Sequence, residues 1–173
     1  MTMTHIETVT VGSGGAASIA FSAIAGDFTD LVLVYSLRNS TNTNYQTMSF
    51  NGSTSNFTQR QLDGEGSGSG TSASRTDSVI RLTAVPSVAT ASTFSSAQIY
   101  IPNYTASVNK SFSVDGVTEN NATQAFQVLI AGLWSQTAAI TSITLTSPAN
   151  FVEHSSASLF GITAGSDGIV SVS

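Results

Sequence analysis

Few residues of this chain could act as an acid, a base or a nucleophile. The two histidines, His5 and His154, are the only side chains that ordinarily titrate near neutral pH, and cysteine is absent. His5 lies in an N-terminal segment of a kind that is commonly mobile. His154 directly follows Glu153, and neighbouring residues of an extended strand point to opposite faces. These two side chains can therefore work together only if they lie in a loop.

The sequence predicts neither a serine nucleophile nor a metal site beside His154. No Gly-x-Ser-x-Gly sequence leading into a helix is present to position a serine beside His154. Glu153 and His154 would diverge from a shared metal ion as adjacent strand residues. The glycines between residues 64 and 70 do not have the spacing of a nucleotide-binding loop. We therefore predict that the protein is not an enzyme and has no catalytic residue, metal site or cofactor.

Aromatic rings are the remaining group that could support a function, because they stack on sugars while neutral Asn and Ser side chains suit sugar hydroxyls. Trp134 shares a predicted strand face with three other apolar residues, which favours a buried position. Tyr45 and Tyr104 lie in or beside turn sequence. We therefore predict Tyr45 and Tyr104 as the exposed contacts of a glycan or receptor site.

Low charge is the most unusual property of the composition. Charged residues make up 9% of the 173 residues, compared with about 25% in an average soluble domain. The net charge is −5 and the five basic residues are spread along the chain, so no basic patch is available for nucleic acid. No stretch approaches about 18 apolar residues, and the N-terminus lacks the features of a signal peptide, so we expect neither membrane association nor a secretion leader.

Two stretches carry apolar side chains on both faces of a predicted strand. Residues 31–37 and 126–134 are apolar at nearly every position, so each has a core face and a second hydrophobic face. The second face needs cover from a helix, a loop or another subunit. Because no long helical pattern is present, we expect other copies of the chain to cover part of these faces. The predicted interface residues there are Val32, Val34, Leu129 and Leu133.

About ten or eleven short alternating segments, separated by Gly, Pro and Asn turns, extend over residues 1–162. This pattern is typical of a single all-β domain, an antiparallel β-sandwich of jelly-roll type. Asn51-Gly52 and Asp115-Gly116 are hairpin signals. Residues 63–74 are rich in Gly and Ser, which predicts a flexible surface loop.

The end of the sequence predicts an arm rather than another core strand. Residues 163–173 follow the last strong strand pattern, and alternation resumes within them at Ile169, Val170 and Val172. We expect this arm to pair with the sheet edge of a neighbouring chain.

A series of short segments carries a family resemblance. The segments are Ile19-Ala-Phe-Ser-Ala-Ile24, Phe28-Thr-Asp-Leu31 continuing to Arg38, Phe50-Asn-Gly52, Ile101-Pro-Asn-Tyr104, Lys110-Ser111, Glu119-Asn-Asn121, Ile130-Ala-Gly-Leu-Trp134, Ile140-Thr-Ser-Ile143 and Ser158-Leu-Phe-Gly-Ile162. In this order they cover nearly the whole chain. The sequence resembles a family of small β-sandwich domains found in virion structural proteins of tailed bacteriophages.

The resemblance implies a non-enzymatic building block of the virion, assembled in the cytoplasm of the bacterial host together with other virion proteins. It supplies no catalytic residues. A closed homo-oligomer is expected, with a trimer favoured by analogy with phage fibres and decorations. The first strand pattern begins within about ten residues of Met1, which favours a capsid decoration or a short head fibre. The alternative is a tail-fibre domain that recognises a host-surface glycan through Tyr45, Tyr104 and the 63–74 loop.

Overall fold

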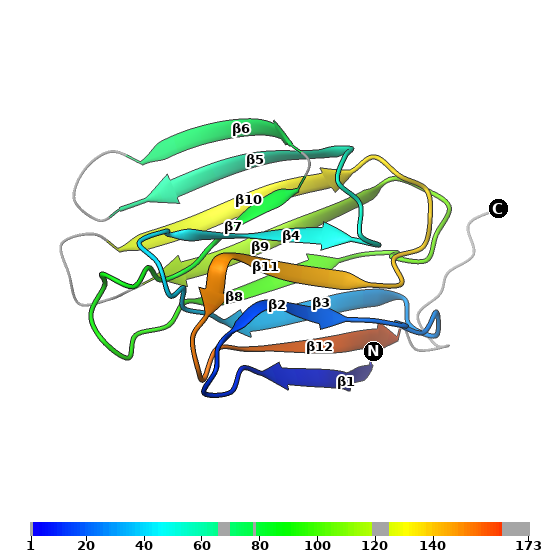
Figure 1. Ribbon diagram of the computed structural model, residues 1–173. Helices are drawn as coiled ribbons and strands as arrows, with labels where there is room; N and C mark the ends of the chain where they lie inside the picture. The colour runs from blue at the N-terminus through cyan, green and yellow to red at the C-terminus, as the bar shows by residue number, and fades with distance from the viewer. Residues whose placement is uncertain (1, 66–69, 78, 119–124, 164–173) are drawn as a thin grey trace.

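The computed structural model describes residues 2–65, 70–77, 79–118 and 125–163, which form two antiparallel sheets packed face to face (Figure 1). Twelve strands and no helix occur in these ranges, which confirms the predicted all-β sandwich. The strands are β1 (Thr2–Thr10), β2 (Ala16–Phe21), β3 (Asp30–Ser36), β4 (Tyr45–Phe50), β5 (Phe57–Gly64), β6 (Thr71–Asp77), β7 (Ile80–Thr83), β8 (Ser96–Ile101), β9 (Lys110–Thr118), β10 (Phe126–Trp134), β11 (Ile143–Phe151) and β12 (Ser156–Thr163).

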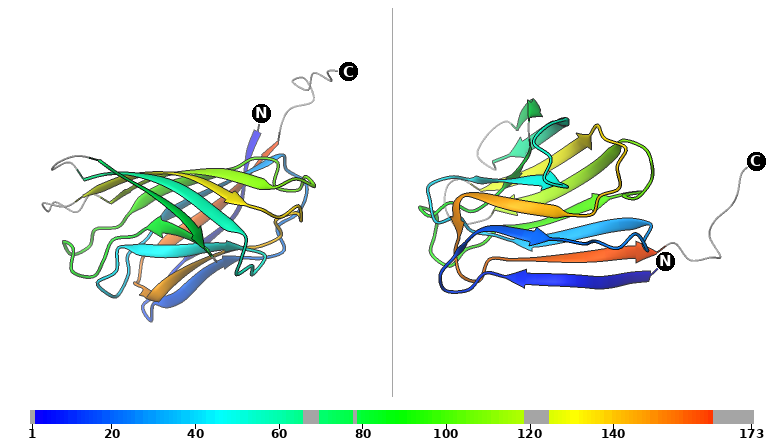
Figure 2. Two further views of the ribbon diagram at one scale, coloured as in Figure 1. Left: turned by 90° about the horizontal axis from the view of Figure 1, so that it is seen from above. Right: turned by 45° about the vertical axis from the view of Figure 1, so that its right-hand side comes forward.

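Eight of these strands are wound as a jelly roll, in which the chain crosses between the sheets at every step except from β4 to β7, which pair directly. The order β1-β12-β3-β8 in one sheet faces β2-β11-β4-β7 in the other. The β5–β6 hairpin is inserted between β4 and β7, and the β9–β10 hairpin between β8 and β11. Both hairpins join β8 in the order β8-β9-β10-β5-β6. They extend one sheet to eight strands, past the edge of the four-stranded sheet (Figures 1 and 2).

The register of the eight-stranded sheet explains why alternation in the sequence predicts its core. Ile130, Val114, Ile99, Leu33 and Leu159 are successive cross-strand partners and form one inward row. Each is at most 4% exposed. Because side chains of a strand alternate between faces, the residues between them point outward. The outward positions are mostly polar, with exposed apolar side chains at Leu62, Leu129, Val117 and Tyr100.

An aromatic cluster fills one end of the sandwich. Phe50 from the four-stranded sheet packs edge-to-face on Phe112 and Trp134, with ring centroids 5.4 and 5.8 Å away, and Phe57 stacks on Trp134 at 6.1 Å. Trp134 is 3% exposed, which confirms its predicted burial. Gly132 lies beneath the Phe112 ring so closely that an added Cβ would sit 2.2 Å from a ring carbon. The absence of a side chain at residue 132 therefore allows this packing.

The turn signals of the sequence have mixed outcomes. Asn51 and Gly52 have φ values of 51° and 65°, and Ser53 N donates to Phe50 O at 2.8 Å, so the predicted tight turn forms. It leads from one sheet to the other instead of joining two paired strands. Asp115 and Gly116 form no turn, because both lie within β9.

The predicted 63–74 loop is also shorter than expected. Residues 63 and 64 end β5 and residues 71–74 belong to β6, and the two strands pair from Phe57 to Asp63. Residues 66–69, between these strands, lie outside the described residues. The segment rich in Gly and Ser therefore includes residues of two paired strands, β5 and β6, which the composition did not predict.

Two of the five basic residues are turned inward and bind backbone carbonyls. The Arg38 guanidinium, 8% exposed, donates to four carbonyl oxygens between residues 87 and 93 at 2.8 to 3.0 Å. The Lys110 ammonium, 1% exposed, donates to the carbonyl oxygens of Ala106, Val108 and Thr137 at 2.6, 2.5 and 3.3 Å. Burial lowers the pKa of Lys110. Each cation therefore stabilises irregular loops whose backbone lacks the regular hydrogen bonds of a sheet.

Candidate functional site

The inserted hairpins leave part of an inner sheet face without a second layer. The four-stranded sheet ends at β7, whereas the eight-stranded sheet continues through β10, β5 and β6 (Figure 1). On β5 the inward positions change accordingly, from buried Phe57 to Gln59, Gln61 and Asp63. Polar residues on an inner face are unusual in a sandwich, because that face normally supplies the core.

Gln59 closes the seam between the two layers. Its side-chain carbonyl accepts from Arg81 N at 2.9 Å, and its Nε2 donates to Arg81 O at 3.3 Å. Gln59 is only 2% exposed. The amide therefore takes the place of a paired strand at the free edge of β7, which satisfies backbone groups that would otherwise lack partners.

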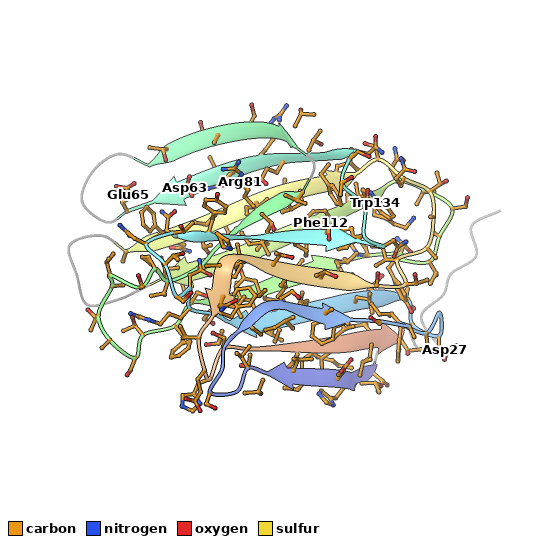
Figure 3. The ribbon with its side chains drawn as sticks, in the orientation of Figure 1. Asp27, Asp63, Glu65, Arg81, Phe112 and Trp134 are labelled. Carbon is orange, nitrogen blue, oxygen red and sulfur yellow. The ribbon has the colours of Figure 1, made fainter. Side chains whose placement is uncertain are left out.

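Beyond Gln59 the seam opens into a cavity of about 170 Å³, here called the seam recess. It is bounded by β4 and β7 on one side and by β5 and β10 on the other. Figure 3 shows Asp63, Glu65 and Arg81 at this end of the molecule, with Trp134 at the opposite end. The lining residues are Asn44, Tyr45, Gln61, Asp63, Glu65, Arg81, Leu82, Thr83, Phe126, Val128 and Ile130.

The polar wall of the seam recess is a ladder of side-chain hydrogen bonds. Gln59 Nε2 donates to Gln61 Oε1 at 2.9 Å, and Gln61 Nε2 donates to Asp63 Oδ1 at 2.7 Å. On the opposite wall the Arg81 guanidinium lies over the Tyr45 ring, with its central carbon 4.9 Å from the ring centroid. The recess thus combines amides, carboxylates, a guanidinium and aromatic rings.

Of the two tyrosines predicted as exposed contacts, only Tyr45 lines this cavity. The prediction of an exposed Tyr104 is wrong, because Tyr104 is 0% exposed. Its hydroxyl donates to Ala25 O and accepts from Phe28 N at 3.4 Å, which ties the 25–28 loop to the core. Burial raises the pKa of the Tyr104 phenol. The turn sequence around Tyr104 therefore belongs to a loop that places the tyrosine ring in the core instead of on the surface.

The candidate acid–base pair lies in the turn between β11 and β12. Glu153 and His154 are both exposed, and His154 has a φ of 72°. The backbone N of His154 donates to Val11 O at 3.0 Å. Within the described ranges, no three His, Asp or Glu side chains gather closely enough to hold a metal ion. No helix there is long and apolar enough to cross a membrane.

The predicted interface residues have different environments. Leu129 is 48% exposed, whereas Val34 and Leu133 are half-buried. Val32 is 5% exposed, because its cross-strand neighbours Tyr100 and Phe160 flank it on the outer face. Val32 therefore does not need the cover from another chain that the sequence suggested. The three candidate residues of the arm, Ile169, Val170 and Val172, lie outside the described residues.

The outer face of the eight-stranded sheet carries exposed apolar residues that the sequence did not single out. Leu62 is 59% exposed and is the direct cross-strand partner of Leu129. Val117 and Tyr100 are 39% and 36% exposed on the neighbouring strands. Leu62, Leu129 and Ala131 line a shallow groove of about 590 Å³. We call Leu62, Leu129, Val117 and Tyr100, which are interspersed with the exposed polar residues Asp115 and Gln98, the outer apolar band.

Comparison with known proteins identifies no relative, since no family model, curated protein or solved structure matches the chain.

Proposed function

We propose that this protein is a non-enzymatic structural subunit of a bacteriophage virion that works as a homo-oligomer, as a capsid decoration or a short head fibre. The observation that carries the proposal is the outer apolar band, because exposed apolar patches on a weakly charged surface mark protein contacts. The jelly roll adds support, as this architecture is common in viral capsid domains. The resemblance of the sequence to phage structural proteins points the same way.

The outer face is large enough for a stable contact between copies. Eight strands about 4.8 Å apart and roughly 25 Å long give a face of roughly 850 Å². A standard protein interface buries about 800 Å² on each partner. The occupant we propose is a second copy of this chain, with other virion proteins as further partners.

Analytical ultracentrifugation at micromolar concentration tests the assembly. We expect the wild type and Val88→Ser to sediment as the same oligomer, because Val88 is 70% exposed in the connection between β7 and β8 and is not part of the outer apolar band. The double variant Leu62→Ser/Leu129→Ser should sediment as a monomer with an unchanged circular dichroism spectrum. A monomeric wild type, or a double variant that assembles like Val88→Ser, contradicts the proposal.

Quantitative mass spectrometry of purified particles tests the position in the virion. A capsid decoration is present at high copy number relative to the major capsid protein, and a fibre at low copy number. Absence of the protein from purified particles contradicts a structural role.

A second candidate function is favoured by Tyr45 and its surroundings. The seam recess places an aromatic ring beside amide and carboxylate groups, which is the combination that binds sugars. The corresponding role is a tail-fibre domain that recognises a host-surface glycan. Binding of fluorescently labelled protein to host cells tests this role, and loss of the binding after enzymatic removal of surface glycans supports it. Unchanged binding to the stripped cells contradicts it.

A further inference from the structure

We propose that the seam recess binds a single neutral sugar ring, a hexose or an N-acetylhexosamine. The proposal rests on the second candidate function and deepens it, and it is independent of the assembly of the outer face. It differs from the site expected from the sequence, because Tyr104 is buried in the core and residues 71–74 of the expected loop are part of β6.

The inward residues of β5 depart from what packing alone requires. Its inward positions Gln61 and Asp63 adjoin Ile130 and Val128 of β10 in the register, so they extend the inward rows of the core. Apolar residues at these positions would bury more surface beneath the edge of β7. Where residues break a local packing rule, a functional role is the common reason.

The polar wall of the seam recess offers both hydrogen-bond donors and acceptors to a ligand. After the ladder has formed, Gln61 retains one amide N–H donor and Asp63 retains its Oδ2 acceptor for a ligand. The hydrogen bond from Gln61 holds Asp63 in place by its Oδ1 atom, so the carboxylate is oriented before a ligand arrives. Neighbouring sugar hydroxyls need such a mixture of donors and acceptors within a few ångströms.

Part of the lining of the seam recess is apolar. Tyr45 and Phe126 are half-buried and border the cavity together with buried Val128 and Ile130. Aromatic and aliphatic surfaces suit the C–H face of a sugar, whose hydroxyls then point sideways toward the polar wall. A small inorganic ion would leave these apolar surfaces unused.

Charge and volume narrow the class of ligand. Two carboxylates, Asp63 and Glu65, face one guanidinium, that of Arg81, so the lining disfavours phosphorylated or carboxylated sugars. A cavity of about 170 Å³ is smaller than the roughly 300 to 1,000 Å³ of pockets for drug-sized ligands. One ring, either free or at the end of a glycan chain, fits this description.

Saturation-transfer NMR on the full chain tests the inference, with glucose, galactose, mannose, N-acetylglucosamine and N-acetylgalactosamine as probes. We expect saturable binding of at least one probe, and about tenfold weaker binding by Tyr45→Ala and Asp63→Asn. Asp115→Asn is the matched control for Asp63→Asn, because Asp115 is exposed on the outer face of the eight-stranded sheet, on strand β9. It should bind like the wild type. Thermal unfolding of each variant shows whether the fold is intact.

Three results overturn the inference. They are the absence of binding by any of the sugar probes, a weakening of sugar binding by Asp115→Asn equal to that by Asp63→Asn, and tighter binding of a cationic amine, cadaverine, than of any sugar. Host-cell binding separates the inference from the second candidate function. If labelled protein binds glycans on cells and Tyr45→Ala binds equally well, the glycan site lies elsewhere and only the inference fails. If a sugar binds the recess but cells are not bound, the inference stands and the fibre role fails.

Discussion

The side-chain amide of Gln59 pairs with the backbone of Arg81 as a neighbouring strand would, by accepting from its N–H at 2.9 Å and donating to its C=O at 3.3 Å. This pair joins the inserted β5 to the jelly-roll strand β7, which lies in the other sheet. It therefore links the two layers at the point where the regular core ends, and it forms the inner boundary of the seam recess.

Replacement of Gln59 by leucine should destabilise the protein. Gln59→Leu keeps a similar volume but removes both partners of the Arg81 backbone, and leaving buried polar groups unsatisfied costs about 1 to 3 kcal/mol. Urea denaturation measures the change in the free energy of unfolding. Gln127→Leu is the control, because Gln127 is exposed on the opposite face of β10. Equal stability of the two variants would show that the amide does not hold the seam.

Alanine at residue 132 should disturb the aromatic cluster. The new Cβ would lie 2.2 and 2.3 Å from two Phe112 ring carbons, and overpacking of this kind costs about 1 to 3 kcal/mol. Gly64→Ala is the control, since the nearest atom to its Cβ would be 4.0 Å away. The double variant Gly132→Ala/Phe112→Leu should regain part of the loss in thermal unfolding. Strictly additive losses would contradict a direct clash.

Removal of the Lys110 charge should loosen the two loops that the ammonium holds. Lys110→Met retains the apolar stem and leaves the carbonyls of Ala106, Val108 and Thr137 without this donor. The expected loss in the free energy of unfolding is about 1 to 3 kcal/mol, with faster amide exchange in residues 104–109. Arg60→Met serves as the control, because Arg60 is exposed on β5. A stable Lys110→Met variant would mean that water replaces the ammonium without cost.

Stability should fall above about pH 10 because of the buried tyrosines. Burial raises the pKa values of Tyr35 and Tyr104, so above the usual phenol pKa the unfolded chain loses these protons first. The stabilisation is complete below that pKa and is lost as the pH rises, by at most about 1.4 kcal/mol per pH unit for each group. Lys110 has a lowered pKa and acts in the opposite direction. Urea denaturation between pH 9 and 11 should therefore show a shallower decline in Tyr35→Phe, and a steeper one in Lys110→Met. Identical slopes in all three proteins would refute the assignment.

The alternation of apolar and polar residues in the sequence predicted most strands, because the core is built from the inward-facing residues of each strand. The inward residues of β3 and β10, such as Leu33 and Ile130, are buried, and their outward neighbours are more exposed. The distribution of strands between sheets could not be read in the same way. A type I′ turn at Asn51-Gly52 is the same local structure whether it joins paired strands or crosses from one sheet to the other.

The candidate site was less predictable, because it depends on contacts distant in the sequence. The positions of Gln59, Gln61 and Asp63 resemble those of any polar strand until the four-stranded sheet is known to end at β7, beside them. Their spacing at every second residue was the available signal, since it places three polar side chains on one strand face. Tyr104 was misplaced for a related reason, as its partners Ala25 and Phe28 lie almost 80 residues earlier, at separations of 79 and 76 residues.

The pairing of β1 also has a consequence for how the chain is made. Within the part of the chain that the structure describes, β1 pairs only with β12, and its Thr8 hydroxyl lies 2.8 Å from that of Ser158, 150 residues later in the sequence. At about 5 to 20 residues per second, a ribosome needs roughly 8 to 30 s to synthesise that interval. The earliest of the strands thus stays unpaired until the latest has emerged. Its solvent-facing Thr, His and Glu residues and the register shift between His5 and Glu7 help to keep it from pairing with other nascent chains during that wait.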